Sequence, residues 1–226
     1  MTANLRVGLL ILAIPLATLG MMIDDYQAGA YELGREGTTP PYTVSDTQYD
    51  AGGEHIFGGQ RDVTLYKISG GGTQPNCNCI PDVEYAGDLG FSTYNSAFGC
   101  NAVWTTTYGL AGDLNANMTG GDAFEVSLIS ADMDNSDPQR PVALTLRVFS
   151  SAGDGTSTRD LIAEGIYSFP FADFPSVDFA DIDRIEFEIV QDSAINDAVD
   201  FALGFFQTNG AVATHSTDWT GLKKSD

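Results

Sequence analysis

A short acidic segment is the first place where the residue types could do chemistry. Residues 132–137 read Asp-Met-Asp-Asn-Ser-Asp, so side-chain oxygens stand at alternate positions between two predicted strands. Ca²⁺ takes six to eight oxygen ligands, and a bound cation relieves the repulsion within a cluster of carboxylates. We therefore expect a Ca²⁺ site here, and its candidate ligands are Asp132, Asp134, Asn135 and Asp137.

This segment departs from the EF-hand pattern. Asp137 stands where that pattern needs Gly, and no Glu follows at the twelfth position. The alternative is a solvated hairpin loop without a metal ion. A second acidic turn contains Asp178, Asp181 and Asp183, and there we expect Asp181 to cap the turn before Arg184.

Aromatic residues in the first half of the chain could bind a sugar, because a flat ring stacks on a pyranose face. The candidates are Trp104, Tyr108, Tyr94 and Tyr85. Trp104 lies in the segment AVWTTTY, for which the alternative is a tryptophan of the core. Five phenylalanines of the second half are expected in the core: Phe169, Phe171, Phe174, Phe179 and Phe187.

Catalytic motifs are missing from the sequence. His55 and His215 are the only histidines, and no Gly-x-Ser-x-Gly, His-Glu-x-x-His or Gly-x-x-x-x-Gly-Lys pattern occurs. Acidic residues are abundant, but glycosidase chemistry needs two of them at a fixed separation in a cleft. We therefore predict no catalytic residues and no enzymatic activity. Arg61 and Asp62 are expected to form an ion pair at the start of a strand.

The three cysteines are Cys77, Cys79 and Cys100. Their spacing matches neither a zinc knuckle nor a redox C-x-x-C motif. In an oxidising compartment we expect either Cys77 or Cys79 to bridge to Cys100, which leaves one thiol for intermolecular pairing. The alternative is three reduced thiols. Asn117-Met118-Thr119 is an acceptor sequence for N-glycosylation.

The charge balance excludes two classes of partner. Lys and Arg number 10 against 31 Asp and Glu, which gives a formal net charge of -21. Phosphate binding needs clustered cations, so nucleic acid is not an expected partner. An anionic membrane surface is excluded for the same reason. Only 18% of the residues are charged and 25 are Gly, a composition typical of secreted all-β domains.

The N-terminus has the sequence pattern of an export signal. Arg6 precedes the uncharged apolar run 7–23, and Ala28-Gly29-Ala30 offers a cleavage site of small residues. We predict an apolar signal helix within residues 1–30, with cleavage after Ala30. The alternatives are an uncleaved membrane anchor, which would be the one membrane contact, and a buried core helix. The first two interpretations place the remainder of the chain outside the cytoplasm.

Alternating apolar and polar residues predict strands through the middle of the chain. Apolar residues alternate with polar ones over five to eight residues, and Gly, Asn and Asp separate the alternating segments. The predicted strands are 61–69, 83–85, 89–94, 102–108, 123–129, 142–149, 165–171, 184–191 and 200–208. This pattern predicts an all-β antiparallel sandwich of jelly-roll type over residues 56–208. Residues 31–55 are predicted to be an extended lead segment, and 209–226 a flexible tail.

Two stretches resemble known families. Residues 57–63, FGGQRDV, resemble a strand opening of secreted bacterial proteins that carry an exosortase sorting tail of the PEP-CTERM type. YSFPFADF at 167–174 and VDFADIDRI at 177–185 resemble the end of the same domain, and of galactose-binding-like jelly rolls and carbohydrate-binding modules. The resemblance covers about 150 residues and implies the fold more than a function. No sorting tail follows Thr208, so the N-terminal segment is the expected anchor if there is one.

These observations predict a secreted, non-catalytic protein with a structural or adhesive role in an extracellular layer, matrix or filament. Its high charge would keep copies apart until salt or Ca²⁺ screens it, and residues 38–50 would then pair with a sheet edge of the next copy. The alternative is a carbohydrate-binding module that recognises extracellular polysaccharide. A third possibility is a Ca²⁺-dependent enzyme with an unrecognised site, which requires carboxylates of raised pKa in a cleft.

Overall fold

The structure is a computed structural model, which describes residues 20–34, 40–69, 76–80, 90–96, 99–132, 142–192 and 199–210. Within these ranges it contains strands, two short 3-10 helices and no α-helix. The first six strands are β1 (Met22–Asp24), β2 (Tyr31–Leu33), β3 (Tyr42–Tyr49), β4 (Gln60–Ser69), β5 (Asn76–Ile80) and β6 (Phe91–Ser96). The others are β7 (Asn101–Tyr108), β8 (Ala123–Asp132), β9 (Val142–Ser150), β10 (Gly153–Leu161), β11 (Gly165–Pro170), β12 (Ile182–Gln191) and β13 (Val199–Thr208). The 3-10 helices are η1 (Phe57–Gly59) and η2 (Phe171–Asp173).

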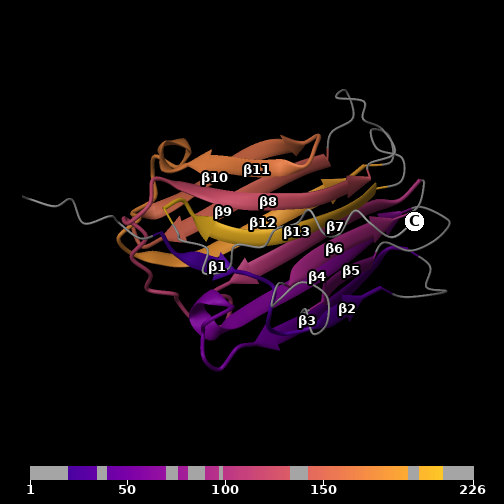
Figure 1. Cartoon of the computed structure of the whole chain (residues 1–226), viewed down its shortest axis with the longest axis horizontal. Coiled ribbons are helices and arrows are strands. Elements are labelled where there is room, and N and C mark those ends of the chain that lie inside the picture. The colour runs from indigo at the N-terminus through magenta and orange to yellow at the C-terminus, as the bar shows by residue number, and fades with distance from the viewer. Residues whose placement is uncertain are drawn as a thin grey trace, which may run out of the picture.

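The strands form two antiparallel sheets (Figure 1). The seven-stranded sheet has the order β11-β8-β13-β6-β5-β2, and β1 lies beside β13. The six-stranded sheet has the order β10-β9-β12-β7-β4-β3. Figure 1 shows β10 and β11 along one side of the molecule and β2 and β3 along the opposite side.

The last eight strands have jelly-roll topology. They pair as β6-β13-β8-β11 in one sheet and β7-β12-β9-β10 in the other, and the chain changes sheet at every step except the β9–β10 hairpin. This is the strand order of a double-sheet jelly roll. The predicted all-β antiparallel sandwich is therefore confirmed.

Side chains that alternate along the strands build the core. On β9 the wholly buried residues are Val142, Leu144, Leu146 and Val148, which are the four that the sequence predicts on one side. Aromatic rings from both sheets complete the core. The Trp104 ring on β7 lies edge-on to Phe187 on β12 of the same sheet at 5.7 Å, and Phe187 contacts Phe206 on β13 of the opposing sheet at 6.1 Å. Alternation of this kind buries one face of each strand and leaves the other face outside.

The sandwich begins before the predicted boundary at Ile56. Strands β1, β2 and β3 lie in the ranges that we predicted to be the signal and the lead segment, yet all three pair within the sheets. Strand β3 pairs with β4 of its own chain, whereas we expected residues 38–50 to pair with a neighbouring copy. Ile23 and Tyr26 are wholly buried, so cleavage after Ala30 would remove part of the core.

The N-terminal helix was predicted within residues 1–30, on the apolar run 7–23. Residues 1–19 lie outside the described residues, but the end of the run forms strand β1 rather than helix. No helix in the described part of the chain is long and apolar enough to cross a membrane. Alternation failed to predict β10, because its sequence GDGTSTRDL has no apolar side chain before its last residue. β10 is an edge strand that buries only Ser157 and Leu161. The predicted strand 83–85 and the tail from residue 211 also lie outside the described residues.

The aromatic core gives a stability prediction. The substitution Phe187→Ala should lower the free energy of unfolding by about 3–5 kcal/mol, because it leaves a cavity beside Trp104 and Phe206. Urea denaturation followed by tryptophan fluorescence measures the change. Ile166→Ala is the control, because Ile166 is 61% exposed, and it should shift the value by no more than about 0.5 kcal/mol. Equal effects of the two substitutions would contradict this description of the core.

Candidate functional site

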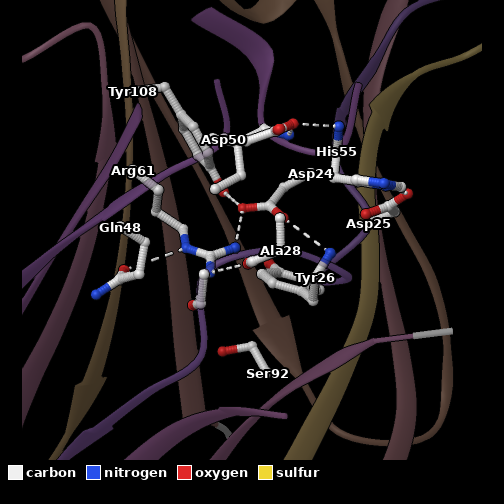
Figure 2. Close-up of polar contacts among 12 residues, drawn as sticks. Asp24, Asp25, Tyr26, Ala28, Gln48, Asp50, His55, Arg61, Ser92 and Tyr108 are labelled. Atoms are coloured by element: carbon white, nitrogen blue, oxygen red, sulfur yellow. Dashed lines mark hydrogen bonds and ion pairs between the residues drawn. The ribbon is translucent and has the colours of Figure 1, made fainter. Parts of the chain in front are cut away.

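Arg61 lies at the centre of a buried polar cluster (Figure 2). Its side chain comes from β4 and is wholly buried, as is the Asp24 side chain from β1. Nη1 of Arg61 donates to Oδ2 of Asp24 at 2.6 Å. Nη2 donates to the carbonyl oxygens of Ala28 at 3.0 Å and of Gly29 at 2.9 Å. The guanidinium group is thus paired on two sides.

The Asp24 carboxylate has partners on both of its oxygens. Oδ2 also accepts from the Tyr108 hydroxyl at 2.7 Å, and Oδ1 accepts from the backbone N–H of Tyr26 at 2.8 Å. Burial raises the pKa of Asp24, although the charge of Arg61 and these hydrogen bonds oppose that shift. Burial, together with the neighbouring Asp24 charge, raises the pKa of Tyr108. Tyr108 is therefore a neutral donor.

The loop after β1 must approach Arg61 closely. Gly29 has a φ of +70°, and a Cβ at this position would lie 2.4 Å from the Cβ of Gln48. Only glycine meets both requirements, since it adopts positive φ without strain and has no side chain. The rings of Tyr26 and Tyr31 lie 5.4 and 5.3 Å from the guanidinium carbon, within the range of cation–π attraction.

This cluster is structural. A guanidinium group that is wholly buried and paired on two sides is not open to a ligand from solvent. The predicted ion pair between Arg61 and Asp62 is wrong, because successive strand residues point to opposite faces. Asp62 accepts instead from Thr47 Oγ1 at 2.7 Å and from Gln60 Nε2 at 2.8 Å, on the outer face of the sheet.

His55 lies beside this cluster (Figure 2), and its side chain is 36% exposed. Its Nδ1 is 2.9 Å from Oδ2 of Asp25, and its backbone N–H donates to Oδ2 of Asp50 at 2.7 Å. The hydrogen bond that the His55 ring makes to Asp25 raises the pKa of His55, and the charges of Asp25, Asp50 and Glu54 act in the same direction. The ring contacts the Asp25 carboxylate, and in the described part of the chain it contacts no hydroxyl or thiol that it could activate. This is the arrangement of an ion pair.

Of the four aromatic residues expected to stack on sugars, three are core residues, and Tyr85 lies outside the described residues. Trp104 and Tyr108 are wholly buried, and Tyr94 is 1% exposed. Trp104 lies 6.2 Å from Tyr94 and 5.9 Å from Phe201 in stacked arrangements, and Tyr94 donates to Oε1 of Gln191. The assignment of these rings to sugar binding is therefore wrong, since strand alternation turns them inward. The alternative of a core tryptophan at position 104 is confirmed.

The predicted Ca²⁺ ligands lie at the end of β8 or outside the described residues. Backbone Asp132 ends β8, whereas Asp134, Asn135 and Asp137 belong to the range 133–141. The described residues contain no group of three or more His, Cys, Asp or Glu that could hold a metal ion. In the second acidic turn, Asp181 accepts from Ser151 Oγ, and Asp178 accepts the N–H of Ala180.

Cys100 is a free thiol in the structure, so the predicted bridge to it is not formed there. Its side chain is buried directly before β7, and burial raises the pKa of the thiol. Cys77 and Cys79 belong to β5, whose side chains lie outside the description. The exposed Asn117 accepts from the N–H of Thr119 at 3.1 Å and from its hydroxyl at 2.7 Å, which brings the two glycosylation residues together.

The outer face of the six-stranded sheet is a site that the sequence analysis missed. We call it the hydroxyl face and define it by three rows of residues that are paired from strand to strand. The central row is Thr158, Thr145, Glu188, Thr105, Thr64 and Ser45. The second row is Thr156, Arg147, Glu186, Thr107, Asp62 and Thr47. The third row is Asp160, Ala143, Val190, Val103, Tyr66 and Thr43.

Side-chain hydrogen bonds hold the rows in place. Thr145 and Thr158 are joined hydroxyl to hydroxyl at 3.0 Å, and Ser45 and Thr64 at 2.9 Å. Arg147 donates to Oε1 of Glu186 at 2.8 Å and to Oε1 of Glu188 at 3.0 Å. All of these side chains are at least partly exposed. The face therefore presents fixed hydroxyl and carboxylate groups to solvent.

Comparison with known proteins gives distant similarities of fold. No family model matches the chain, and no curated protein matches it. The family 11 carbohydrate-binding module of the cellulosomal cellulase Lic26A-Cel5E of Clostridium thermocellum is 14% identical, with a TM-score of 0.38, over 88% of this chain and 99% of that module. The family 11 module from the same organism in complex with a β-1,3-1,4-mixed-linked tetrasaccharide is 15% identical, with a TM-score of 0.35, over 86% and 98%. An exo-β-agarase is 9% identical, with a TM-score of 0.36, over 84% of this chain and 24% of that enzyme. The strand order described above, rather than these similarities, defines the fold.

Removal of Asp24 should destabilise the protein strongly. Asp24→Ala leaves the Arg61 charge buried without its carboxylate, which typically costs about 3–5 kcal/mol of unfolding free energy. Urea denaturation measures the loss, and Asp25→Ala is the matched control, with an expected loss of about 1 kcal/mol or less. The double variant Asp24→Leu, Arg61→Met should recover much of the lost stability, because no charge is then buried. A double variant as unstable as Asp24→Ala would contradict this account.

His55 should make stability depend on pH. Because its pKa is raised in the folded state, its stabilising effect is complete below the unfolded value of about 6.5 and is lost as pH rises through the folded pKa. The free energy of unfolding, measured in urea between about pH 5.5 and 8.5, should therefore fall more steeply for the wild type than for His55→Asn. Parallel profiles of the two proteins would show that the pair with Asp25 contributes nothing.

Proposed function

We propose that the protein binds extracellular polysaccharide through the hydroxyl face and does no covalent chemistry on it. The observation that carries the proposal is the ordered array of hydroxyl and carboxylate groups across six strands, of which all but the buried Thr107 are at least partly exposed. Sugars present hydroxyl groups in several directions, and carboxylate, hydroxyl and guanidinium groups are suitable partners for them. Groups held in place before binding lose little conformational entropy when the ligand arrives.

The spacing of the face suits an extended ligand. Adjacent strands lie about 4.8 Å apart, so each row offers one side chain at that interval across the sheet. In the central row a carboxylate, Glu188, lies between Thr145 and Thr105. Arg147 engages Oε1 of this carboxylate, and Oε2 has no hydrogen-bond partner among the described residues. A chain of sugar units lying along the row would meet acceptors and donors in succession.

Two exposed tyrosines supply the flat apolar surface that the buried rings do not. Tyr66 is 39% exposed and lies in the third row, and Tyr49 is 70% exposed at the end of β3. Both residues lie on the outer side of the sheet, since Tyr66 pairs with Thr43 and Tyr49 with Gln60. A tyrosine combines an apolar ring with a polar hydroxyl, which suits a surface that a ligand only partly covers.

Charge indicates the class of polysaccharide. The rows hold four carboxylates, those of Glu186, Glu188, Asp62 and Asp160, against the single guanidinium of Arg147. The whole chain carries a formal net charge of -21. Repulsion should therefore keep acidic polysaccharides away, and neutral ones are the expected ligands.

Four predictions from the sequence accompany this proposal without support from the described residues. Export from the cell is expected of a polysaccharide-binding protein and rests on the N-terminal sequence. A bound Ca²⁺ at Asp132, Asp134, Asn135 and Asp137 stays a prediction, as does membership among exosortase-sorted proteins. Assembly into a layer or filament also stays a prediction, and polysaccharide binding does not require it.

Retardation in native gels that contain soluble polysaccharide tests the proposal. We expect neutral β-glucan or xylan to slow the protein and polygalacturonate to leave it unaffected. Tyr66→Ala and Glu188→Gln should each weaken binding about tenfold, which corresponds to about 1.4 kcal/mol. Ile166→Ala is the control, since Ile166 is exposed on the other sheet. Binding that survives both substitutions, or no binding to any neutral polysaccharide, would contradict the proposal.

A further inference from the structure

We propose that a leader peptide is removed between Gly20 and Met21, so that the mature chain begins at the first residue of the folded domain. The processing step is hydrolysis by a signal peptidase: water is added across the Gly20–Met21 peptide bond, which leaves a carboxylate on Gly20 and an ammonium group on Met21. The inference does not depend on polysaccharide binding. It rests on where the folded domain begins.

Residues from Met21 onward are built into the sheet. The N–H of Met21 donates to Thr208 Oγ1 at 2.7 Å, and the carbonyl of Met21 accepts from the N–H of Thr208 at 2.8 Å. Immediately after it, β1 pairs with β13. An ammonium group at Met21 keeps a donor for Thr208 Oγ1, so the cleavage that we propose leaves this attachment intact.

The residues between Met21 and Ala30 cannot be part of a discarded leader. Ile23, Asp24 and Tyr26 are all wholly buried, and Asp24 carries the charge that neutralises Arg61. Cleavage after Ala30 would also remove the carbonyl groups of Ala28 and Gly29, which accept from the Arg61 guanidinium. The product would retain a buried cation that has lost its partners, at a cost of several kcal/mol.

The position of β1 also limits what the apolar run can do. Once Met21 and the following residues belong to the fold, the run that is left is Val7–Gly20, which is fourteen residues long. As a helix it would extend about 21 Å, at 1.5 Å per residue. The hydrocarbon core of a bilayer is about 30 Å thick, so the run is too short to span it. It matches the apolar region of a signal peptide, which is about 7–15 residues long.

The residues before the proposed cleavage point have suitable sizes. Signal peptides end with small residues at the last position and the third-last position. Here these positions hold Gly20 and Thr18, with Leu19 between them. Gly20 directly precedes the first strand contact, so the bond to Met21 lies where the chain joins the domain.

The experiment expresses the full chain with its own N-terminus in an exporting bacterial host and measures the intact mass of the exported protein. The expected mass is that of residues 21–226. Gly20→Tyr should make the uncleaved precursor accumulate, because a large residue does not fit the last leader position. Ala30→Tyr is the matched control: Ala30 is exposed, and processing should match the wild type. Precursor and product are quantified in denatured samples, so the readout does not require that a variant folds.

Several results would overturn the inference. A mass that corresponds to residues 31–226, or an exported protein that keeps residues 1–20, would exclude cleavage at Gly20. Normal processing of Gly20→Tyr, or blocked processing of Ala30→Tyr, would do the same. Polysaccharide binding plays no part in these readouts, so a failure of the proposed function leaves this test unaffected.

Discussion

The buried ion pair between Asp24 and Arg61 is the constraint that organises the N-terminal half of the molecule. Asp24 belongs to the seven-stranded sheet, whereas Arg61 and Tyr108 belong to the six-stranded sheet, so one carboxylate joins the two layers. Neither charge is tolerable alone, because an unpaired buried ion costs several kcal/mol. Strand β1 must therefore be in place whenever Arg61 on β4 is enclosed by the fold.

The same pair fixes the register of β1, which its apolar residues alone would leave loosely defined. Met22 and Ile23 could pack against β13 in more than one register. A slip of one residue would move Ile23 from the core to the opposite face and carry Asp24 away from Arg61. The hydrogen bonds of Met21 to Thr208 hold the strand from its other end. A strand of only three residues is thus positioned by polar contacts at both of its ends.

Alternation of apolar and polar residues predicted the central strands of both sheets, and it failed where a strand does not face the core on one side. The sequence pattern predicts strands β9 and β12 directly, since each places apolar residues inward at every second position. Strand β10 is an edge strand of small polar residues, so it carries no such signal. Strand β1 was read as part of a leader, because a short buried strand directly after an apolar run has the same composition as the run. The pairing of Asp24 with Arg61 joins residues 37 positions apart and has no local signature.

The candidate site was missed for a related reason. Alternation shows that a strand has two faces, but the opposing sheet decides which of them is buried. In β7 the sequence offers a tryptophan at position 104 and a threonine at position 105, and burial of the larger ring sets the threonine outside. The hydroxyl face is then assembled one residue per strand, so that neighbours in a row such as Arg147 and Glu186 are 39 positions apart in the sequence. A motif search finds residues at fixed short spacing, whereas a binding face on a jelly roll follows from strand order, which only the folded chain provides.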